Sequence, residues 1–244
     1  MKIALAQINT TIGDFQGNSK LILEYIRRAG QRNADLVVFP ELTLTGYPPK
    51  DLLDRPDFIQ ANLKALQALR KKIKNVACVV GFVDQRKDLT GKPLANAAAL
   101  IHRGKVLHVV HKTLLPTYDV FDEGRYFEAG RGHAPVVSFK GKKLGISICE
   151  DMWSDESYWG RRFYTQNPIQ EQMEAGADIL INISASPYSM GKGKVRRDVL
   201  TNPAKKYGVP VVYVNLVGGN DDLIFDGTSS VIDAKGREVL RLAS

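Results

Sequence analysis

The chain contains 244 residues, of which 44% are hydrophobic and 25% are charged, and its formal net charge is +8 at pH 7. This length and composition indicate one sizeable globular domain with a well-filled core. No apolar run approaches the roughly 18 residues of a membrane-spanning helix, and the amino-terminal stretch lacks the pattern of a signal peptide. We therefore expect a cytoplasmic protein with no membrane partner.

The positive charge leaves an anionic partner open, but its distribution argues against nucleic acid. Lysine and arginine are scattered, and their densest group, residues 191–197, lacks interleaved aromatic side chains. We therefore expect a solvated basic face or a small-molecule contact there, and no nucleic-acid partner. The two cysteines and four histidines show no metal-binding spacing, so we also expect no metal site and no disulfide scaffold.

The first half of the chain alternates apolar runs with amphipathic stretches. Apolar runs predict strands at residues 2–8 and 35–41, with a helix between them at residues 17–31. After an irregular segment we expect a helix at residues 57–74, a strand at residues 76–83, and a hairpin at residues 96–112 that turns at Arg103 and Gly104.

The second half repeats this order. Residues 174–184, 207–217 and 227–242 resemble, in turn, residues 31–41, 74–84 and 96–110. Two copies of one unit, with apolar runs that suit strands covered on both faces, predict an α/β fold: a four-layer αββα sandwich of two packed sheets. We treat residues 1–244 as one domain and expect a closing strand to be missing after the second hairpin.

Cys149 ends the apolar run that begins at Leu144. Side chains alternate along a strand, so we expect Cys149 to share the less crowded face with Gly145 and Ser147. Ligand sites of open α/β sheets lie at the carboxyl ends of strands, which suits a nucleophile there. Cys78 has apolar neighbours on both sides and fits a core thiol instead.

A carboxylate and an amine end two other predicted strands. Glu41 closes the strand at residues 35–41, where Pro40 prevents a normal continuation of the ladder, and Lys112 closes the hairpin. A carboxylate at the end of so apolar a run needs a partner or a chemical role. Glu41, Lys112 and Cys149 therefore form a candidate catalytic group.

The sequence around these three residues resembles the nitrilase superfamily of carbon-nitrogen hydrolases, with its Glu-Lys-Cys triad. The motifs LTGYPPKDLL, LPTYDVFDEGRYFEAG, CEDMW and NISASPYSMGK are most similar to one branch, the amino-terminal glutaminase domain of glutamine-dependent NAD synthetases. The resemblance runs over essentially the whole chain, and the four motifs occur in order.

The resemblance implies a role for each residue. Glu41 would be the general base, Cys149 the nucleophile on the glutamine carboxamide, and Lys112 with the Glu150 N–H the oxyanion stabiliser. Glu123 would support Lys112; its alternative is a solvated loop acid. The family's pocket positions are matched by Tyr47, Tyr118 and Phe121, with Ser186 and Lys192 for the substrate carboxylate.

The resemblance also implies partners. The substrate would be L-glutamine, and the ammonia released would serve a carboxyl-terminal synthetase domain that amidates deamido-NAD with ATP and magnesium. None of that domain lies in this chain, the glutaminase reaction itself would need no cofactor, and the family forms homo-oligomers. Two alternatives stay open: a nitrilase-type amidase for another small amide, and a non-catalytic or anion-binding module that keeps the fold.

Overall fold

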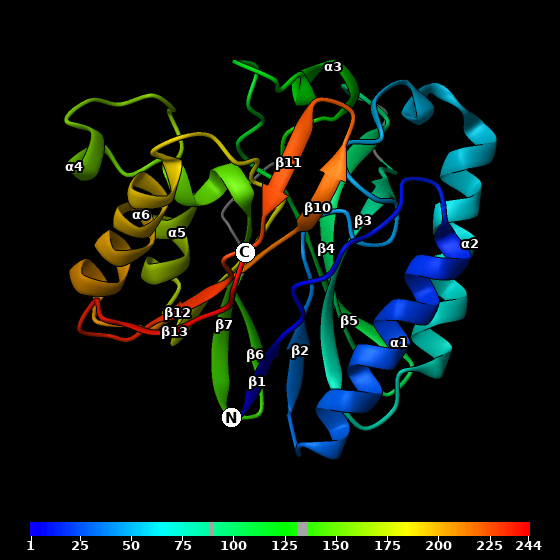
Figure 1. Cartoon of the computed structure of the whole chain (residues 1–244), viewed down its shortest axis with the longest axis horizontal. Helices are drawn as coiled ribbons and strands as arrows, with labels where there is room; N and C mark the ends of the chain where they lie inside the picture. The colour runs from blue at the N-terminus through cyan, green and yellow to red at the C-terminus, as the bar shows by residue number, and fades with distance from the viewer. Residues whose placement is uncertain (88–89, 131–135) are drawn as a thin grey trace.

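The computed structural model describes residues 1–87, 90–130 and 136–244. Its centre consists of two sheets that face each other (Figure 1). The first sheet contains, in spatial order, β1 (Ile3–Leu5), β2 (Leu36–Val38), β3 (Ala77–Gln85), β4 (Leu94–His102) and β5 (Lys105–His111). The second contains, in spatial order, β13 (Glu238–Arg241), β12 (Ser230–Ile232), β9 (Val211–Asn215), β8 (Ile179–Ser184), β7 (Lys142–Ile148) and β6 (Val136–Phe139).

The two sheets share one plan, as the internal repeat predicts. Each has three neighbouring parallel strands, β1-β2-β3 in one and β7-β8-β9 in the other. Each continues into an antiparallel hairpin, β4-β5 or β12-β13. The second sheet adds β6 at its other edge, antiparallel to β7. A separate ribbon of β10 (Val217–Asn220) and β11 (Leu223–Asp226) lies near the end of the sandwich (Figure 1).

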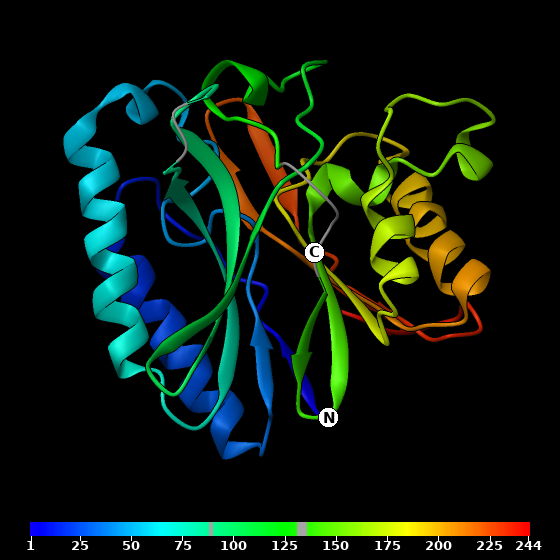
Figure 2. The same ribbon diagram turned by 180° about the vertical axis from the view of Figure 1, so that it is seen from behind.

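Helices cover the outer face of each sheet (Figure 2). The first sheet is covered by α1 (Phe15–Gln31) and α2 (Pro56–Lys72), and the second by α5 (Pro168–Glu174) and α6 (Lys192–Tyr207). Four shorter helices complete the set described: η1 (Lys50–Asp54), α3 (Glu123–Tyr126), η2 (Cys149–Trp153) and α4 (Glu156–Trp159). The predicted four-layer αββα sandwich is confirmed.

The strands are apolar on both faces because each face packs against another layer. In β2, Val37 packs in the cluster beneath α1 and α2, whereas Leu36 and Val38 pack between the sheets. Ile146 and Ile181 face them from the second sheet. Full burial on both sides explains why these strands read as continuous apolar runs.

The ends of several strands and helices differ from the predicted ones. The strands expected at residues 2–8 and 35–41 are shorter, Ile3–Leu5 and Leu36–Val38. Pro40 lacks an N–H for the ladder, so the chain leaves the sheet before it. The two long helices begin one or two residues earlier than predicted, and Arg103 and Gly104 form the expected turn, both with positive φ.

Candidate active site

A buried turn after β2 brings Glu41 to the end of both sheets. Glu41 is fully buried, and its Oε1 accepts a hydrogen bond from Asn96 Nδ2 at 2.7 Å. Its Oε2 accepts from the backbone N–H of Ala185, just after β8, at 2.9 Å. The turn can approach β3 because Gly81 has no side chain: a Cβ there would lie 2.3 Å from the Leu42 nitrogen. Donors from both sheets thus fix the carboxylate.

Lys112 lies between two carboxylates. It directly follows β5, and its Nζ donates to Glu41 Oε1 at 2.8 Å and to Glu123 Oε1 at 2.7 Å. The exposed fractions are 1% for Lys112, 0% for Glu41 and 6% for Glu123. Burial opposes the charge on Lys112, but the two carboxylates outweigh burial and raise its pKa well above the ordinary value. Two acids and one ammonium therefore form one closed network.

Glu123 is a buried member of this network and not a solvated loop acid. Its Oε1 also accepts a hydrogen bond from the Tyr47 hydroxyl at 2.9 Å. Burial raises the pKa of Glu123, and the nearby Lys112 charge acts in the opposite direction. Tyr47 lines a smaller cavity of about 260 Å³, which Phe121 and Glu123 also line, and is not among the lining residues of the main cavity.

Cys149 begins the short helix η2, immediately after β7. Its φ of 44° is left-handed, so the strand's alternation stops at Ile148. Cys149 consequently packs with Ile146 and Ile148 between the sheets, and the expected placement beside Gly145 and Ser147 is wrong. The thiol is 5% exposed and lines the main cavity.

The surroundings of Cys149 keep its thiol neutral. Burial is the main cause that raises its pKa, and the negative charge of Glu41 adds to it. Lys112 favours the thiolate but is outweighed, and Glu150 and Glu123 oppose ionisation further. A group that removes the proton during attack is therefore required if Cys149 is a nucleophile.

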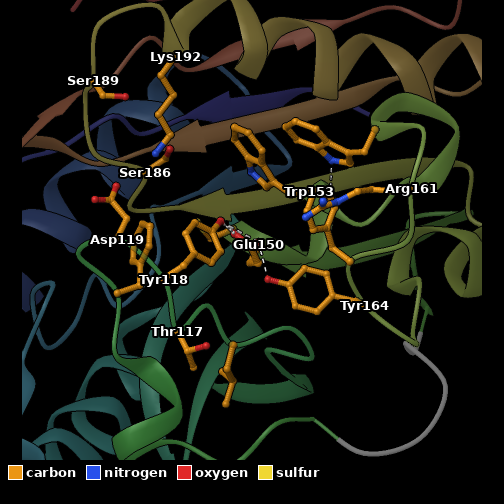
Figure 3. A pocket seen from close by; sticks show the side chains of 15 residues that line it. Thr117, Tyr118, Asp119, Glu150, Trp153, Arg161, Tyr164, Ser186, Ser189 and Lys192 are labelled. Carbon is orange, nitrogen blue, oxygen red and sulfur yellow. Dashed lines mark hydrogen bonds between the residues drawn. The ribbon is translucent and has the colours of Figure 1, made fainter.

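The main cavity has a volume of about 630 Å³ and brings together most of the predicted pocket residues. Cys149, Tyr118, Phe121, Ser186 and Lys192 all line it. The Lys192 Nζ lies 5.7 Å from the centre of the Phe121 ring, and burial lowers the pKa of Lys192. Figure 3 shows the Lys192 side chain reaching into the cavity from α6.

Glu150 lines the cavity, and the sequence did not predict a role for its side chain. It is buried, and both Tyr118 and Tyr164 donate to its carboxylate, Tyr118 at 2.9 and 3.0 Å and Tyr164 at 2.7 Å. The two tyrosines point toward it from opposite sides (Figure 3). The sequence signal for this side chain is an acid directly after the cysteine.

Arg196 is a second residue that sequence reasoning missed. Its Nη1 contacts both carboxylate oxygens of Asp226, at 2.9 and 3.0 Å, and its Nη2 donates to the Ser186 carbonyl at 3.3 Å. It is 3% exposed, although it belongs to the basic group at residues 191–197, for which we expect a solvated face or a small-molecule contact. Arg196 is four residues after Lys192 in α6, and this spacing puts the two side chains on the same face of a helix.

The described residues contain neither a metal-binding cluster of acidic, His or Cys side chains nor a membrane-spanning helix. Within residues 1–87, 90–130 and 136–244, no group of three or more His, Cys, Asp or Glu side chains could hold a metal ion. Across the same ranges, every helix is too short or too polar to span a bilayer.

Comparison with known proteins identifies the family. The carbon-nitrogen hydrolase family matches residues 2–243. The chain belongs to this family. A glutamine-dependent NAD(+) synthetase from Synechocystis sp. is 45% identical over 243 residues, which are 98% of this chain and 43% of that protein. The enzyme of the same name from Thermotoga maritima is 41% identical, over 98% of this chain and 39% of its own length.

Solved structures agree with this carbon-nitrogen hydrolase assignment. A glutamine-dependent NAD+ synthetase from Acinetobacter baumannii superposes with a TM-score of 0.89 at 39% identity, over 99% of this chain and 43% of that one. An amidase from Nesterenkonia sp. AN1, at 24% identity and a TM-score of 0.82, shares the fold. The chain thus spans about two fifths of the length of the synthetases it resembles.

Proposed function

We propose that this domain is a glutaminase, which hydrolyses the side-chain amide of L-glutamine through a thioester on Cys149. The observation that carries the proposal is the closed network of Glu41, Lys112 and Glu123 beside a neutral thiol that opens into a cavity. The relatives whose names include glutamine dependence support the choice of substrate.

In the first step Glu41 takes the thiol proton as the sulfur attacks the amide carbon. The tetrahedral oxyanion is stabilised by the Lys112 ammonium and by the backbone N–H of Glu150. Glu41 then returns the proton to the leaving nitrogen, which departs as ammonia. Glu123 holds Lys112 in position through its hydrogen bond, and Tyr47 holds Glu123 in turn.

The second step regenerates the thiol. Glu41 accepts a proton from water, the resulting hydroxide attacks the thioester carbonyl, and the same oxyanion contacts act again. Collapse of this intermediate releases glutamate and returns the proton to the sulfur. No cofactor takes part in either step.

The cavity offers a contact for each part of glutamine. Lys192 and Ser186 would bind the α-carboxylate, and the carboxylate of Glu150 would bind the α-ammonium. Tyr118 and Phe121, whose rings are 5.8 Å apart, would enclose the aliphatic stem. A point charge at Lys192 gives less directional recognition than an arginine would.

The complete protein would use the ammonia elsewhere. We propose that a synthetase domain fused to this one consumes it to amidate deamido-NAD with ATP and magnesium, and that the protein works as a homo-oligomer in the cytoplasm. The lengths of the relatives support a further domain. These partners are proposals about the whole protein.

The test is ammonia and glutamate release from L-glutamine by this chain. We expect hydrolysis without NAD formation, and a loss of at least about a thousandfold in kcat for Cys149→Ala. Cys78→Ala, which changes a fully buried thiol in the outer cluster of the first sheet, should retain activity. Release that persists in Cys149→Ala contradicts the mechanism. Acetamide or propionamide hydrolysed faster than glutamine would favour a general amidase.

A further inference from the structure

Asp151 is a buried acid that the catalytic scheme above does not use. It is 1% exposed, and the hydrogen bonds described for its carboxylate are all to backbone N–H groups. Its Oδ2 accepts from Ile148 at 3.0 Å, and its Oδ1 accepts from Thr113 at 3.0 Å and Leu114 at 2.8 Å. Burial raises the pKa of Asp151 to about 7, and the three backbone donors act in the opposite direction and offset part of the cost of burying the carboxylate.

The three donors lie at the ends of strands that belong to two different sheets. Ile148 is the last residue of β7 and directly precedes Cys149, whereas Thr113 directly follows Lys112 beyond β5. β5 and β7 belong to opposite sheets, so no ladder of hydrogen bonds joins them. The carboxylate of Asp151 therefore links the backbone at Cys149 to the backbone at Lys112.

The backbone at Cys149 needs such support. A residue with a side chain in the left-handed region costs about 1–2 kcal/mol, and Cys149 has a φ of 44°. The Asp151 carboxylate accepts the N–H of Ile148, the residue before Cys149. Asn182 Nδ2 donates to the carbonyl oxygen of Cys149 at 3.4 Å. These contacts fix the direction in which the sulfur points.

We propose that Asp151 is a positioning residue for the glutaminase reaction, which sets the spacing between the Cys149 sulfur and the Lys112 ammonium. The inference rests on the proposed function. The hydrogen bonds described for the Asp151 carboxylate are all to backbone N–H groups, so it acts through the two backbone segments and not by touching glutamine. Its loss should lower kcat and leave KM nearly unchanged.

An asparagine cannot replace the carboxylate. Its single oxygen could still accept from Thr113 and Leu114, but its NH₂ group would then face the Ile148 N–H, donor against donor. A glutamate keeps the carboxyl group and both of its oxygens but displaces them by one methylene. Both variants should therefore misplace the sulfur or the ammonium, and a displacement near 1 Å can cost about a hundredfold in rate.

The experiment compares Asp151→Asn and Asp151→Glu with Asp178→Asn. Asp178 is the matched control because its carboxylate accepts the Lys143 N–H at 2.7 Å near the opposite end of β7, far from the cavity. Steady-state glutaminase kinetics are measured well below each variant's thermal midpoint. We expect kcat to fall about 100-fold for Asp151→Asn and about tenfold for Asp151→Glu, with KM within twofold and Asp178→Asn unchanged.

The outcomes separate the inference from the proposed function. An unmodified chain that releases no ammonia from glutamine overturns the glutaminase proposal itself. An active chain in which a folded Asp151 variant keeps kcat within twofold, or raises KM without lowering kcat, overturns the positioning role. If Asp151→Asn does not fold, Asp151→Glu, which retains a carboxyl group for the same donors, decides the question alone.

Discussion

At the scale of single residues, the site is defined by how charge is balanced in a buried space. Glu41, Lys112 and Glu123 are all withdrawn from solvent, and each depends on the others to remain there. The same carboxylates help keep the Cys149 thiol protonated. A thiolate is therefore not stored in the free protein, and in the proposed mechanism proton transfer to Glu41 accompanies attack on the substrate.

Removal of the ammonium should expose this dependence. Lys112→Met leaves two buried carboxylates without a cation, so we expect the free energy of unfolding to fall by about 3–5 kcal/mol at pH 8, with loss of glutaminase activity. Lys50→Met is the matched control, because the Lys50–Asp221 ion pair has side chains 52% and 55% exposed. That control should lose no more than about 1 kcal/mol. Urea titrations provide the measurement.

The pH dependence of Lys112→Met has a definite sign. Burial already raises the pKa of Glu123 with Lys112 present, and without that ammonium its pKa rises further. A carboxyl whose pKa is higher in the folded state binds a proton on folding, so stability falls as pH rises through the interval between the two pKa values. The deficit of the variant should therefore shrink between pH 8 and pH 5. A deficit that grows toward pH 5 contradicts this account.

At the scale of elements, each candidate residue lies just beyond the end of a strand. Lys112 follows β5, Cys149 follows β7, and the Glu41 turn follows β2. β5 runs in the same direction as β3, because two antiparallel pairings separate them, so all these ends meet at one end of the sandwich. Rigid strands therefore fix the positions of side chains that belong to short turns.

The close approach of the Glu41 turn to β3 should be sensitive to one methyl group. In Gly81→Ala the new Cβ would meet the Leu42 nitrogen at 2.3 Å and the Pro40 oxygen at 2.8 Å, both backbone atoms that cannot rotate away. We expect a loss of about 1–3 kcal/mol in stability and a lowered kcat, because the turn and its carboxylate must shift.

Gly193→Ala is the matched control for this effect. Gly193 lies in α6, and a Cβ there meets nothing within 4 Å. Replacement of a helical glycine by alanine should raise stability by about 0.5–1 kcal/mol and leave kcat unchanged. Thermal unfolding and glutaminase rates of both variants provide the comparison. A Gly81→Ala protein with unchanged stability and kcat would show that the turn tolerates displacement.

The sequence predicted which residues follow the strand ends better than it predicted the backbone conformation and the hydrogen-bond partners at the site. Apolar runs that stop at a polar residue located Glu41, Lys112 and Cys149, because strand burial leaves a strong pattern. The conformation of Cys149 was missed, since a positive φ at a cysteine has no sequence signature. Glu150 and Arg196 were missed as binding or buried groups, because their partners Tyr164 and Asp226 lie 14 and 30 residues away along the chain.

At the scale of the whole molecule, two similar sheets pack face to face and create one site where their strands end. The internal repeat in the sequence predicted both sheets, and family membership agrees with the fold. The site needs both halves: Glu41 and Lys112 come from the first sheet's side, and Cys149 and Ala185 from the second. The structure thus brings residues distant in sequence close to one thiol.

The most direct test of the central claim is covalent labelling of Cys149 by a chloroketone analogue of glutamine, followed by intact-mass measurement and peptide mapping. We predict one added label, located on Cys149, that is formed more slowly in the presence of excess L-glutamine and is absent in Cys149→Ala. Cys78, fully buried in the same protein, should remain unlabelled. An unlabelled Cys149, or labelling that glutamine does not slow, would contradict the assignment of this cavity as a glutamine site with Cys149 as its nucleophile.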